Sequence, residues 1–475
     1  MGFTKESDFE LALIALLKQK GWEEKVIEYP TENDLLKNWA DILFENNRET
    51  DRLNNVPLTD SEMQQILEQI AELKTPLKLN GFINGKNISI RRDNELDNLH
   101  FGKEISLKIY DRLEIAGGQS KYQIVRQPQF PTKSPILKDR RGDIMLLING
   151  MPVFHIKLKR SGVPISQACY QIEKYAQEGI FSGLFALVQI FVAMTPEKTL
   201  YFANPNGQFN PNYYFHWADF NNEPVNDYKD IASQFLSIPM AHQLIGFYMV
   251  PDDTDGVLKV MRSYQYYAAH AISDRVSKLK WQNYQEQRGG YIWHTTGSGK
   301  TMTSFKSAQL ISSSQDADKV IFLMDRIELG TQSLEEYRNF ADENQQVQET
   351  KSTYELIKKL KSNNSSDTLI VTSIQKMSNL AKEQVMKESD LAKITAKRIV
   401  IIVDECHRST LVICCKILSE PLRELYFSVL LVRQFLKIIR RKIVQQQTYL
   451  AMSYIVIVLP TVSEIKTFSV LIFTR

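Results

Sequence analysis

The chain has 475 residues, 43% of them hydrophobic and 24% charged, with a formal net charge of +3. This length excludes a single ordinary domain and predicts two or three domains of a globular soluble protein. The nearly balanced charge gives no general argument for nucleic acid, so any basic surface must be local. The four cysteines form no spaced framework, no apolar run is long enough for a membrane span, and the start does not resemble a signal peptide. We therefore expect a cytoplasmic protein with no membrane contact.

The first half predicts an α+β domain over residues 1–255. Apolar residues at helical spacing indicate an amphipathic helix over Ser7–Gly21, and a mostly polar stretch with a further helical pattern near 62–73 follows to about 98. Strands are expected over 121–127, 143–150 and 151–159, with Asn149-Gly150 as a hairpin turn between the last two. A helix over 165–179 and strands over 185–196 and 198–205 come next. The turn-rich segment 204–227 is expected to be a surface excursion.

The pattern changes to α/β after the polar sequence "VPDDTDG", which suggests a boundary near residue 255. The runs "KVIFLMD", "DTLIVTS" and "KRIVIIVDE" are short, rich in Val and Ile, and separated by helical or polar segments. Buried strands of a parallel sheet have this pattern. The fold class expected for the whole chain is therefore α/β, with an α+β domain followed by a parallel-sheet domain over 256–410.

The strongest motif is "HTTGSGKTMTS", which follows a predicted strand and opens a helix from Gly299. Glycines let backbone amides turn around phosphate oxygens, and the helix N-terminus adds positive potential. Lys300 can reach the β and γ phosphates of ATP, and the Thr301 hydroxyl can bind Mg²⁺. The phosphate-binding loop itself would be formed by Thr296, Gly297, Ser298 and Gly299. The first glycine of the general pattern is replaced by His294, but the accompanying motifs disfavour a chance glycine turn.

The sequence "IVIIVDECHRS" supplies the acidic partners of this loop. Asp404, at the end of an apolar strand, can hold Mg²⁺, and Glu405 can activate the attacking water. His407 would couple the nucleotide site to DNA. Gln265 lies about thirty residues before the loop, where adenine-reading glutamines occur, although alone it is weak evidence.

Taken in order, "HTTGSGKT", "DRIELGTQ" and "DECHRS" resemble the motor of the restriction (R) subunit of type I restriction-modification enzymes. The resemblance runs to about Thr410. It implies an N-terminal PD-(D/E)xK nuclease domain, followed by two RecA-like lobes and a helical domain. It also implies a complex with modification (methyltransferase) and specificity subunits. Such a complex pumps double-stranded DNA with ATP and Mg²⁺ and cuts it far from the recognition site.

The resemblance assigns nuclease roles to several residues of the first half. Asp143 matches the first acid and would hold Mg²⁺, and Lys159 matches the lysine of the family's Glu-x-Lys sequence. The helix after the hairpin carries the Q-x-x-x-Y element as Gln171 and Tyr175, and Glu10 is expected to be a further acid near the metal. Acids at one sheet edge would hold the metal, and the lysine would stabilise developing charge.

Position 157 departs from this pattern, because Lys157 stands where the family has glutamate. The change removes a ligand and places a cation where a divalent ion should bind. His155 lies on the same face and is at most a weak substitute. The sequence therefore predicts impaired or absent cleavage by this chain.

The tail from Leu411 to Arg475 also departs from the family. Codons can be chosen for "LVICC" and "FSVLLVRQ" that, read one base earlier, encode the family-like "FGDML" and "FGFTGTP". One offset serves both places, so we infer a single-base deletion near the Thr410 codon and an out-of-frame tail over 411–475. A divergent natural tail is the alternative. We expect a chain without the second motor lobe not to translocate DNA.

Three functions follow from these patterns. The first is the R subunit of a type I restriction enzyme, a site-specific ATP-dependent endonuclease, here in an impaired copy. The second is a non-catalytic DNA- or subunit-binding remnant of such a subunit. A stand-alone superfamily 2 helicase is the third, and Asp143, Lys159 and the Gln171–Tyr175 pair disfavour it.

Overall fold

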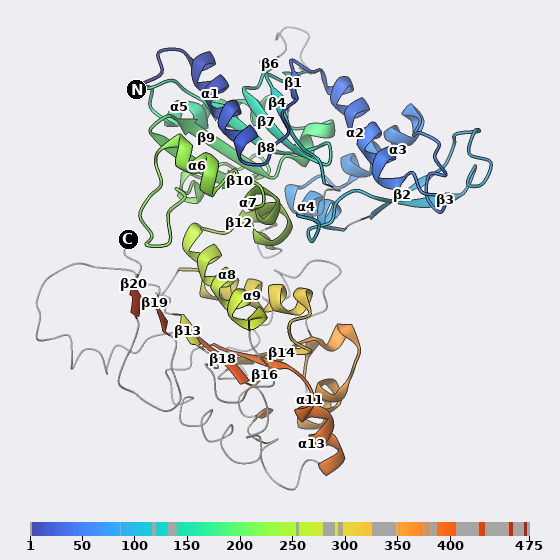
Figure 1. Ribbon diagram of the computed structural model, residues 1–475, viewed down its shortest axis with the longest axis vertical. Coiled ribbons are helices and arrows are strands. Elements are labelled where there is room, and N and C mark those ends of the chain that lie inside the picture. Colours follow the sequence, from blue (N-terminus) through green and yellow to red (C-terminus); the bar gives the residue numbers. More distant parts are fainter. Residues whose placement is uncertain are drawn as a thin grey trace, which may run out of the picture. The chain divides into compact units, whose positions relative to one another are not determined.

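The computed structural model describes most of the chain as two compact units (Figure 1). The first unit comprises Met1–Trp217 and Pro224–Arg262, and the second comprises Ala218–Glu223 and Ser263–Arg475. The described residues are 2–85, 87–115, 120–131, 140–252, 256–278, 290–292, 298–324, 348–350, 352–373, 376–377, 379, 387–404, 427–432, 456–458 and 470–472. The units divide several residues after the expected boundary at 255. The reason is that β12 (Val257–Val260) pairs with β11 (Met249–Asp252) as a hairpin of the first unit.

The first unit is a mixed α/β structure around one sheet. Its helices are α1 (Glu6–Gln19), α2 (Glu32–Asn47), α3 (Asp60–Glu72), α4 (Pro76–Asn84), α5 (Ser166–Gln177), α6 (Tyr228–Gln234) and α7 (Met240–Gln243), with short turns of other helix types at η1 (Gly183–Leu187), η2 (Pro211–Tyr213) and η3 (Leu244–Tyr248). Its other strands are β1 (Val26–Glu28), β2 (Asn87–Arg91), β3 (Glu104–Lys108), β4 (Tyr122–Arg126), β5 (Gln129–Phe130), β6 (Arg140–Arg141), β7 (Ile144–Ile148), β8 (Met151–Leu158), β9 (Ile190–Thr195) and β10 (Lys198–Ala203).

The central sheet has six strands in the order β1-β4-β7-β8-β9-β10. Strands β1/β4 and β8/β9 are parallel, and the other neighbours are antiparallel. Every residue of β7, β8 and β9 is buried, so both faces of these central strands are covered. A charged side chain on β8 is therefore taken out of water unless it reaches the end of the strand.

The β7–β8 hairpin sets the register of the strands that carry the predicted nuclease residues. Asn149 and Gly150 both have positive φ, as a two-residue hairpin turn requires. Near the turn Leu147 pairs with Pro152, but after a β-bulge Leu146 pairs with Phe154, which leaves Val153 as the extra residue. The register then runs to Ile144 opposite Ile156, so the next position beyond β7, Asp143, faces residue 157. Without the bulge it would face Ile156.

Most elements expected in the first half are confirmed, but three expectations need correction. The segment 204–227 is not simply a surface excursion, because Trp217 is fully buried against Tyr201 and Phe235. The strand expected from 185 begins only at Ile190, since the residues before it form η1. The polar stretch before residue 98 also contains α2, α4 and β2, which pairs with β3 beyond it, and these elements were not expected from the sequence.

The second unit is built on a largely parallel sheet. Its helices are α8 (Ser263–Ser277), α9 (Lys300–Ser314), α11 (Thr353–Lys361) and α13 (Glu388–Thr395), with the short turn η4 (Ser365–Asp367). Its strands are β13 (Gly290–Ile292), β14 (Lys319–Met324), β15 (Gln348–Glu349), β16 (Leu369–Ser373), β17 (Ile399–Asp404), β18 (Phe427–Val432), β19 (Val456–Val458) and β20 (Val470–Ile472).

The strand order in this sheet is β15-β16-β14-β17-β18-β13-β19-β20. All neighbours from β15 to β13 are parallel, which confirms the expectation for β14, β16 and β17, and α9 packs on these three strands. The last three strands in the chain, β18, β19 and β20, fall within the segment expected to be out of frame. Among the described residues, no helix is long and apolar enough to cross a membrane.

Candidate active sites

The expected nuclease centre of the first unit contains an ion pair. Lys157 Nζ lies 2.7 Å from Asp143 Oδ1, and the backbone N–H of Leu158 donates to Asp143 Oδ2 at 2.7 Å. The side chains are 5% and 16% exposed, so the pair is largely shielded from water. Burial lowers the pKa of Lys157, but the Asp143 carboxylate, with Tyr175 and Glu6, raises it by more, so the pKa lies above its usual value. Lys157 is therefore charged and neutralises Asp143.

Glu10, from α1, lies beside this pair as a second buried acid. It is 4% exposed and is held by Arg126 Nε and by Gln127 Nε2, which approaches both carboxylate oxygens at 3.3 and 3.4 Å. Burial raises the pKa of Glu10 and the charge of Asp143 adds to the rise, while the hydrogen bonds from Arg126 and Gln127 oppose it. The sequence reading did not single out Arg126 or Gln127. Their only local signal is their position at the end of a strand.

Gln127 ties Glu10 to the strand that carries Asp143. Its backbone has φ of 49°, which is unusual for a residue other than glycine, and its N–H donates to the Asp143 carbonyl at 2.7 Å. The same residue therefore fixes the backbone at Asp143 and the carboxylate of Glu10.

Lys159 lies directly after the end of β8 and points to α1 rather than to Asp143. Its Nζ is 3.0 Å from Glu6 Oε1, and its side chain is 15% exposed. The two lysines of the strand thus have different carboxylate partners, Lys157 with Asp143 and Lys159 with Glu6. Glu6 was not among the expected site residues, because nothing in the local sequence marks it as the partner of a lysine far along the chain.

Gln171 and Tyr175 of α5 contact one another as their i, i+4 spacing predicts. Gln171 Nε2 donates to the Tyr175 hydroxyl at 3.1 Å, and that hydroxyl donates to the Arg141 carbonyl at 3.0 Å, two residues before Asp143. Lys157 Nζ lies 5.8 Å from the centre of the Tyr175 ring. The structure therefore places Asp143, Lys157 and Tyr175 together, with Glu10 on the Asp143 side.

His155 lies in an apolar surrounding that does not suit a metal ligand. It is fully buried among the rings of Phe130, Phe181 and Phe191, and neither ring nitrogen has a hydrogen-bond partner among the described residues. Burial, with a smaller contribution from the Lys157 charge, lowers the pKa of His155 to about 3. The weak candidate ligand of the sequence reading is a neutral core residue.

The side chains present do not fit a divalent metal at this centre. No group of three His, Cys, Asp or Glu residues able to hold a metal occurs within the part of the chain that the structure describes. Asp143 Oδ1, which a metal would need, is occupied by the Lys157 ammonium. A second cation at this position would be repelled at short range in a poorly hydrated site.

The second unit carries the predicted phosphate loop at the start of α9. Gly299 has φ of 77°, a conformation that favours glycine, and α9 begins at Lys300. Ser298, Lys300 and Thr301 are all partly exposed at the start of the helix. The side chain of Gln265 donates to the Ser298 carbonyl at 3.1 Å, so Gln265 lies against the loop. Thr296 and Gly297 lie outside the described residues.

The pairing of the strands brings the second half of the motif to the same level of the sheet. Ile292 of β13 and Asp404 of β17 both pair with Val432 of the intervening β18. Two strand spacings of about 4.8 Å each put their backbones roughly 10 Å apart. The chain leaves β13 toward the phosphate loop at this level. The side chain of Asp404, and all of Glu405 and His407, lie outside the described residues.

Comparison with known proteins gives two family matches that follow one another along the chain. The model for the type I restriction enzyme R protein N terminus matches residues 3–209, and the model for the SWI2/SNF2 ATPase matches residues 264–428. The first match covers most of the first unit and contains Glu10, Asp143, Lys157, Lys159, Gln171 and Tyr175. The second begins one residue after α8 starts and contains the phosphate loop and Asp404.

Curated relatives match between 41% and 86% of the chain. The type I restriction enzyme SsaAORF53P endonuclease subunit of Staphylococcus saprophyticus is 34% identical over 420 residues, which is 86% of this chain and 40% of that protein. The C-terminal part of the type I restriction enzyme MpnIIP endonuclease subunit of Mycoplasma pneumoniae is 37% identical over 198 residues, 41% of this chain and 93% of that sequence. The EcoprrI endonuclease subunit of Escherichia coli is 29% identical over 276 residues, 57% of this chain and 82% of that sequence.

Proposed function

Because the chain belongs to the endonuclease subunits of type I restriction enzymes, we propose that it is an R subunit whose nuclease centre is disabled by Lys157. The chain spans about 40% of the length of the staphylococcal relatives. The proposed activity of the intact family is ATP-dependent translocation along double-stranded DNA and double-strand cleavage of unmodified foreign DNA. This copy would retain the architecture of the nuclease domain without its metal-dependent chemistry.

The observation that carries this proposal is the Asp143–Lys157 ion pair. In the PD-(D/E)xK arrangement, acids at one sheet edge hold Mg²⁺, which activates water and shields the phosphate. Here the register of the β7–β8 hairpin brings residue 157 opposite Asp143, which is where a glutamate would complete such a group with Asp143 and Glu10. With lysine at 157, the carboxylate of Asp143 is neutralised by a side chain of the same protein, which cannot dissociate as a bound ion would.

The remaining nuclease residues have roles that do not require a bound metal. Lys159, near Glu6 on the surface of the centre, would approach the DNA phosphate. Gln171 and Tyr175 hold the backbone at Arg141 and thereby position Asp143. In this copy we assign Lys159 to DNA binding, and Gln171 and Tyr175 to positioning Asp143. The proposed nuclease domain, residues 1–255 by sequence, corresponds to the first unit.

We propose that the second unit contains the first RecA-like lobe of the motor, which was expected over 256–410 from the sequence and which begins at Ser263 in the structure. Its phosphate loop at Gly299 and Lys300 would hold the ATP phosphates, Thr301 and Asp404 would bind Mg²⁺, and Glu405 would activate water. The match to the SWI2/SNF2 ATPase supports a nucleotide-binding lobe. Gln265 would act through the loop backbone, because its amide contacts the Ser298 carbonyl.

The tail over 411–475 remains a separate proposal, a reading-frame change near the Thr410 codon. The SWI2/SNF2 match runs to residue 428 and so includes residues 411–428 of this tail, which does not favour a change at the Thr410 codon itself. Resequencing the gene across the codons of Lys157 and Thr410 tests this directly. A frame that is open and unshifted in the same strain would exclude the deletion.

The partners proposed for the chain are double-stranded DNA and the modification and specificity subunits of the bacterial cytoplasm, as in the family. A non-catalytic DNA- or subunit-binding remnant is the second candidate function, and the buried ion pair favours it for the nuclease domain. A stand-alone helicase is disfavoured by the R protein match over residues 3–209.

Incubating the chain and its partner subunits with supercoiled plasmid, ATP and Mg²⁺ separates these candidates. Cleavage would identify an active nuclease, and DNA or subunit binding without cleavage would identify the remnant.

A further inference from the structure

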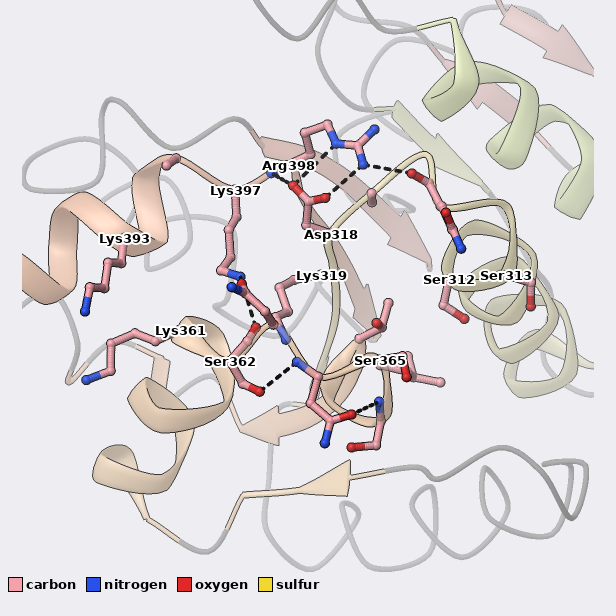
Figure 2. Close-up of a pocket in the computed structure, with 18 residues that line it drawn as sticks. Ser312, Ser313, Asp318, Lys319, Lys361, Ser362, Ser365, Lys393, Lys397 and Arg398 are labelled. Atoms are coloured by element: carbon pink, nitrogen blue, oxygen red, sulfur yellow. Dashed lines mark hydrogen bonds and ion pairs between the residues drawn. The ribbon is translucent and has the colours of Figure 1, made fainter.

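A basic pocket lies at the edge of the second unit's sheet where the parallel strands begin (Figure 2). Its walls are the ends of α9, α11 and α13 with the starts of the strands that follow them, β14, β16 and β17. The phosphate loop follows the end of β13, whereas this pocket lies where the parallel strands start. Helix α9 runs from the phosphate loop to this pocket. Since α9 has 15 residues, the two places are about 20 Å apart along the helix. The pocket is therefore not part of the nucleotide site.

The charge of this pocket is strongly one-sided. Its cationic lining residues are Lys319, Lys361, Lys393, Lys397 and Arg398, and Asp318 is the one acidic residue among the described residues that line it. Arg398 pairs with Asp318 and Lys361 pairs with Asp390, each at 2.8 Å. Three lysines therefore remain without a carboxylate ion pair within the described residues. The C-termini of α9, α11 and α13 each contribute roughly half a negative charge. Together with the three lysines, the pocket therefore has a net charge of about +1.5.

Two of these three lysines are held in place by neutral oxygens. Lys319 Nζ donates to the Asp367 carbonyl at 2.7 Å, and Lys397 Nζ donates to the Ser362 carbonyl at 2.9 Å and to Asn363 Oδ1 at 2.6 Å. Lys319 is only 1% exposed. Burial and the nearby Lys397 charge lower the pKa of Lys319 to about 8, although Asp367 and Asp318 act in the opposite direction. An anion beside these ammonium groups would supply the missing countercharge.

The rest of the lining suits phosphate oxygens and offers little to a base. It is formed mostly by hydroxyl and amide side chains, among them Ser362, Ser365 and Thr368, besides Ala317, Leu369 and Ala396, and no aromatic ring occurs among the described residues of the lining. Bases bind to proteins largely by stacking on such rings. Figure 2 shows Lys361, Lys393 and Lys397 on one side of the pocket, with Ser312 and Ser313 of α9 on the other. Its volume of about 1070 Å³ exceeds what a single anion needs and admits several linked phosphates.

We propose that this basic pocket, around Lys319, Lys393 and Lys397, binds consecutive phosphate groups of a polyanion. The chemistry is the same for the backbone of double-stranded DNA and for a free chain of phosphates. Binding would be independent of base sequence and weakened by salt, because it depends on ammonium–phosphate contacts. The proposal does not depend on the state of the nuclease centre.

The test compares two charge-matched double variants of the full chain. Lys393→Glu with Lys397→Gln removes two pocket lysines, whereas Lys358→Glu with Lys387→Gln changes exposed lysines outside its lining. All proteins carry Lys300→Ala so that the phosphate loop does not dominate binding. The probes are inorganic tripolyphosphate and a mixed-sequence DNA duplex, with affinity measured at several salt concentrations. Lys393→Glu alone serves as a second pocket variant if the double variant is unstable, because Lys393 is exposed.

The pocket variant should bind at least one probe about tenfold more weakly. The number of phosphate contacts given by the salt dependence of its affinity should fall by up to two. Loss for both probes, or for DNA alone, assigns the site to a DNA backbone, and loss for tripolyphosphate alone assigns it to a free phosphate chain. Calorimetry at pH 8 in two buffers should show proton uptake, since a bound anion favours charged Lys319. Equal affinity of the pocket variant and its control for both probes would overturn the proposal.

Discussion

Lys157 Nζ and Asp143 Oδ1 are 2.7 Å apart, in a pair that is only 5% and 16% exposed. The β-bulge at Val153 is what sets this geometry, since it shifts the hairpin register by one residue and puts position 157 opposite Asp143. A lysine is therefore in the place that an acidic ligand would need. The same register that would serve a metal centre here creates a buried salt bridge.

The buried pair has a consequence for stability. Removing the carboxylate with Asp143→Asn leaves the Lys157 ammonium unpaired in the interior, which costs about 3–5 kcal/mol of the free energy of unfolding. Lys157→Met removes the buried cation instead and leaves the more exposed Asp143, so its cost should be smaller. Chemical denaturation of the two variants measures the difference. Equal destabilisation, or none from Asp143→Asn, would contradict a buried ion pair.

The buried histidines predict a loss of stability in acid. The pKa of His155 is about 3 in the folded chain, whereas an ordinary histidine has a pKa of 6.5, so the unfolded state takes up a proton first as pH falls. This loss starts near pH 6.5 and continues to about pH 3. At pH 5 it amounts to about 2 kcal/mol. His155→Phe, in its aromatic surrounding, should remove this contribution, so that the variant loses less stability than the parent chain between pH 7 and pH 5.

His242 provides the control for that measurement. Its pKa is lowered to about 4, mainly by burial, but its ring nitrogens lie 3.0 Å from the Tyr122 hydroxyl and 3.2 Å from the Asp111 carbonyl. His242→Phe should also reduce the acid dependence, yet lower stability at pH 7 through the lost hydrogen bonds. A His155→Phe variant whose stability falls between pH 7 and 5 as steeply as in the parent chain would show that His155 is not neutral in the fold.

The phosphate loop makes a prediction about Gly299. A Cβ at this position would lie 2.2 Å from Gln265 Nε2, and the backbone φ of 77° is strained for any L side chain. Gly299→Ala should therefore cost about 1–2 kcal/mol of stability and weaken ATP binding by moving the loop or Gln265. Fluorescent-nucleotide titration measures the binding. Adding Gln265→Ala relieves the contact but not the φ strain, so it should restore binding only in part.

Much of the fold follows from local sequence patterns, and the rest depends on contacts between distant segments. Asn149-Gly150 predicts the β7–β8 turn, and the apolar runs ending at Ser373 and Asp404 predict parallel strands, because these signals are local. The bulge at Val153 has no local signal. Trp217 lies in a polar, turn-rich stretch, and its burial depends on Tyr201 and Phe235.

The candidate site divides in the same way. The i, i+4 spacing of Gln171 and Tyr175 gives their contact directly, and the hairpin brings Asp143 and Lys157 together. The partners of Glu10 and Lys159 could not be predicted, since Arg126 and Glu6 reach them from segments more than a hundred residues away in the chain. The basic pocket is formed by three separate strand starts, so no single stretch of sequence reveals it.

The central claim is that Lys157 is what disables the nuclease centre, and Lys157→Glu tests it most directly. The parent chain, Lys157→Glu and the neutral control Lys157→Gln are compared in the complex with partner subunits. Calorimetry measures Mg²⁺ binding, and nicking of supercoiled plasmid measures cleavage. We predict that only Lys157→Glu gains Mg²⁺ binding and Mg²⁺-dependent nicking, by on the order of a hundredfold or more over the parent. A parent chain that binds Mg²⁺ and nicks DNA as fast as Lys157→Glu would contradict the claim.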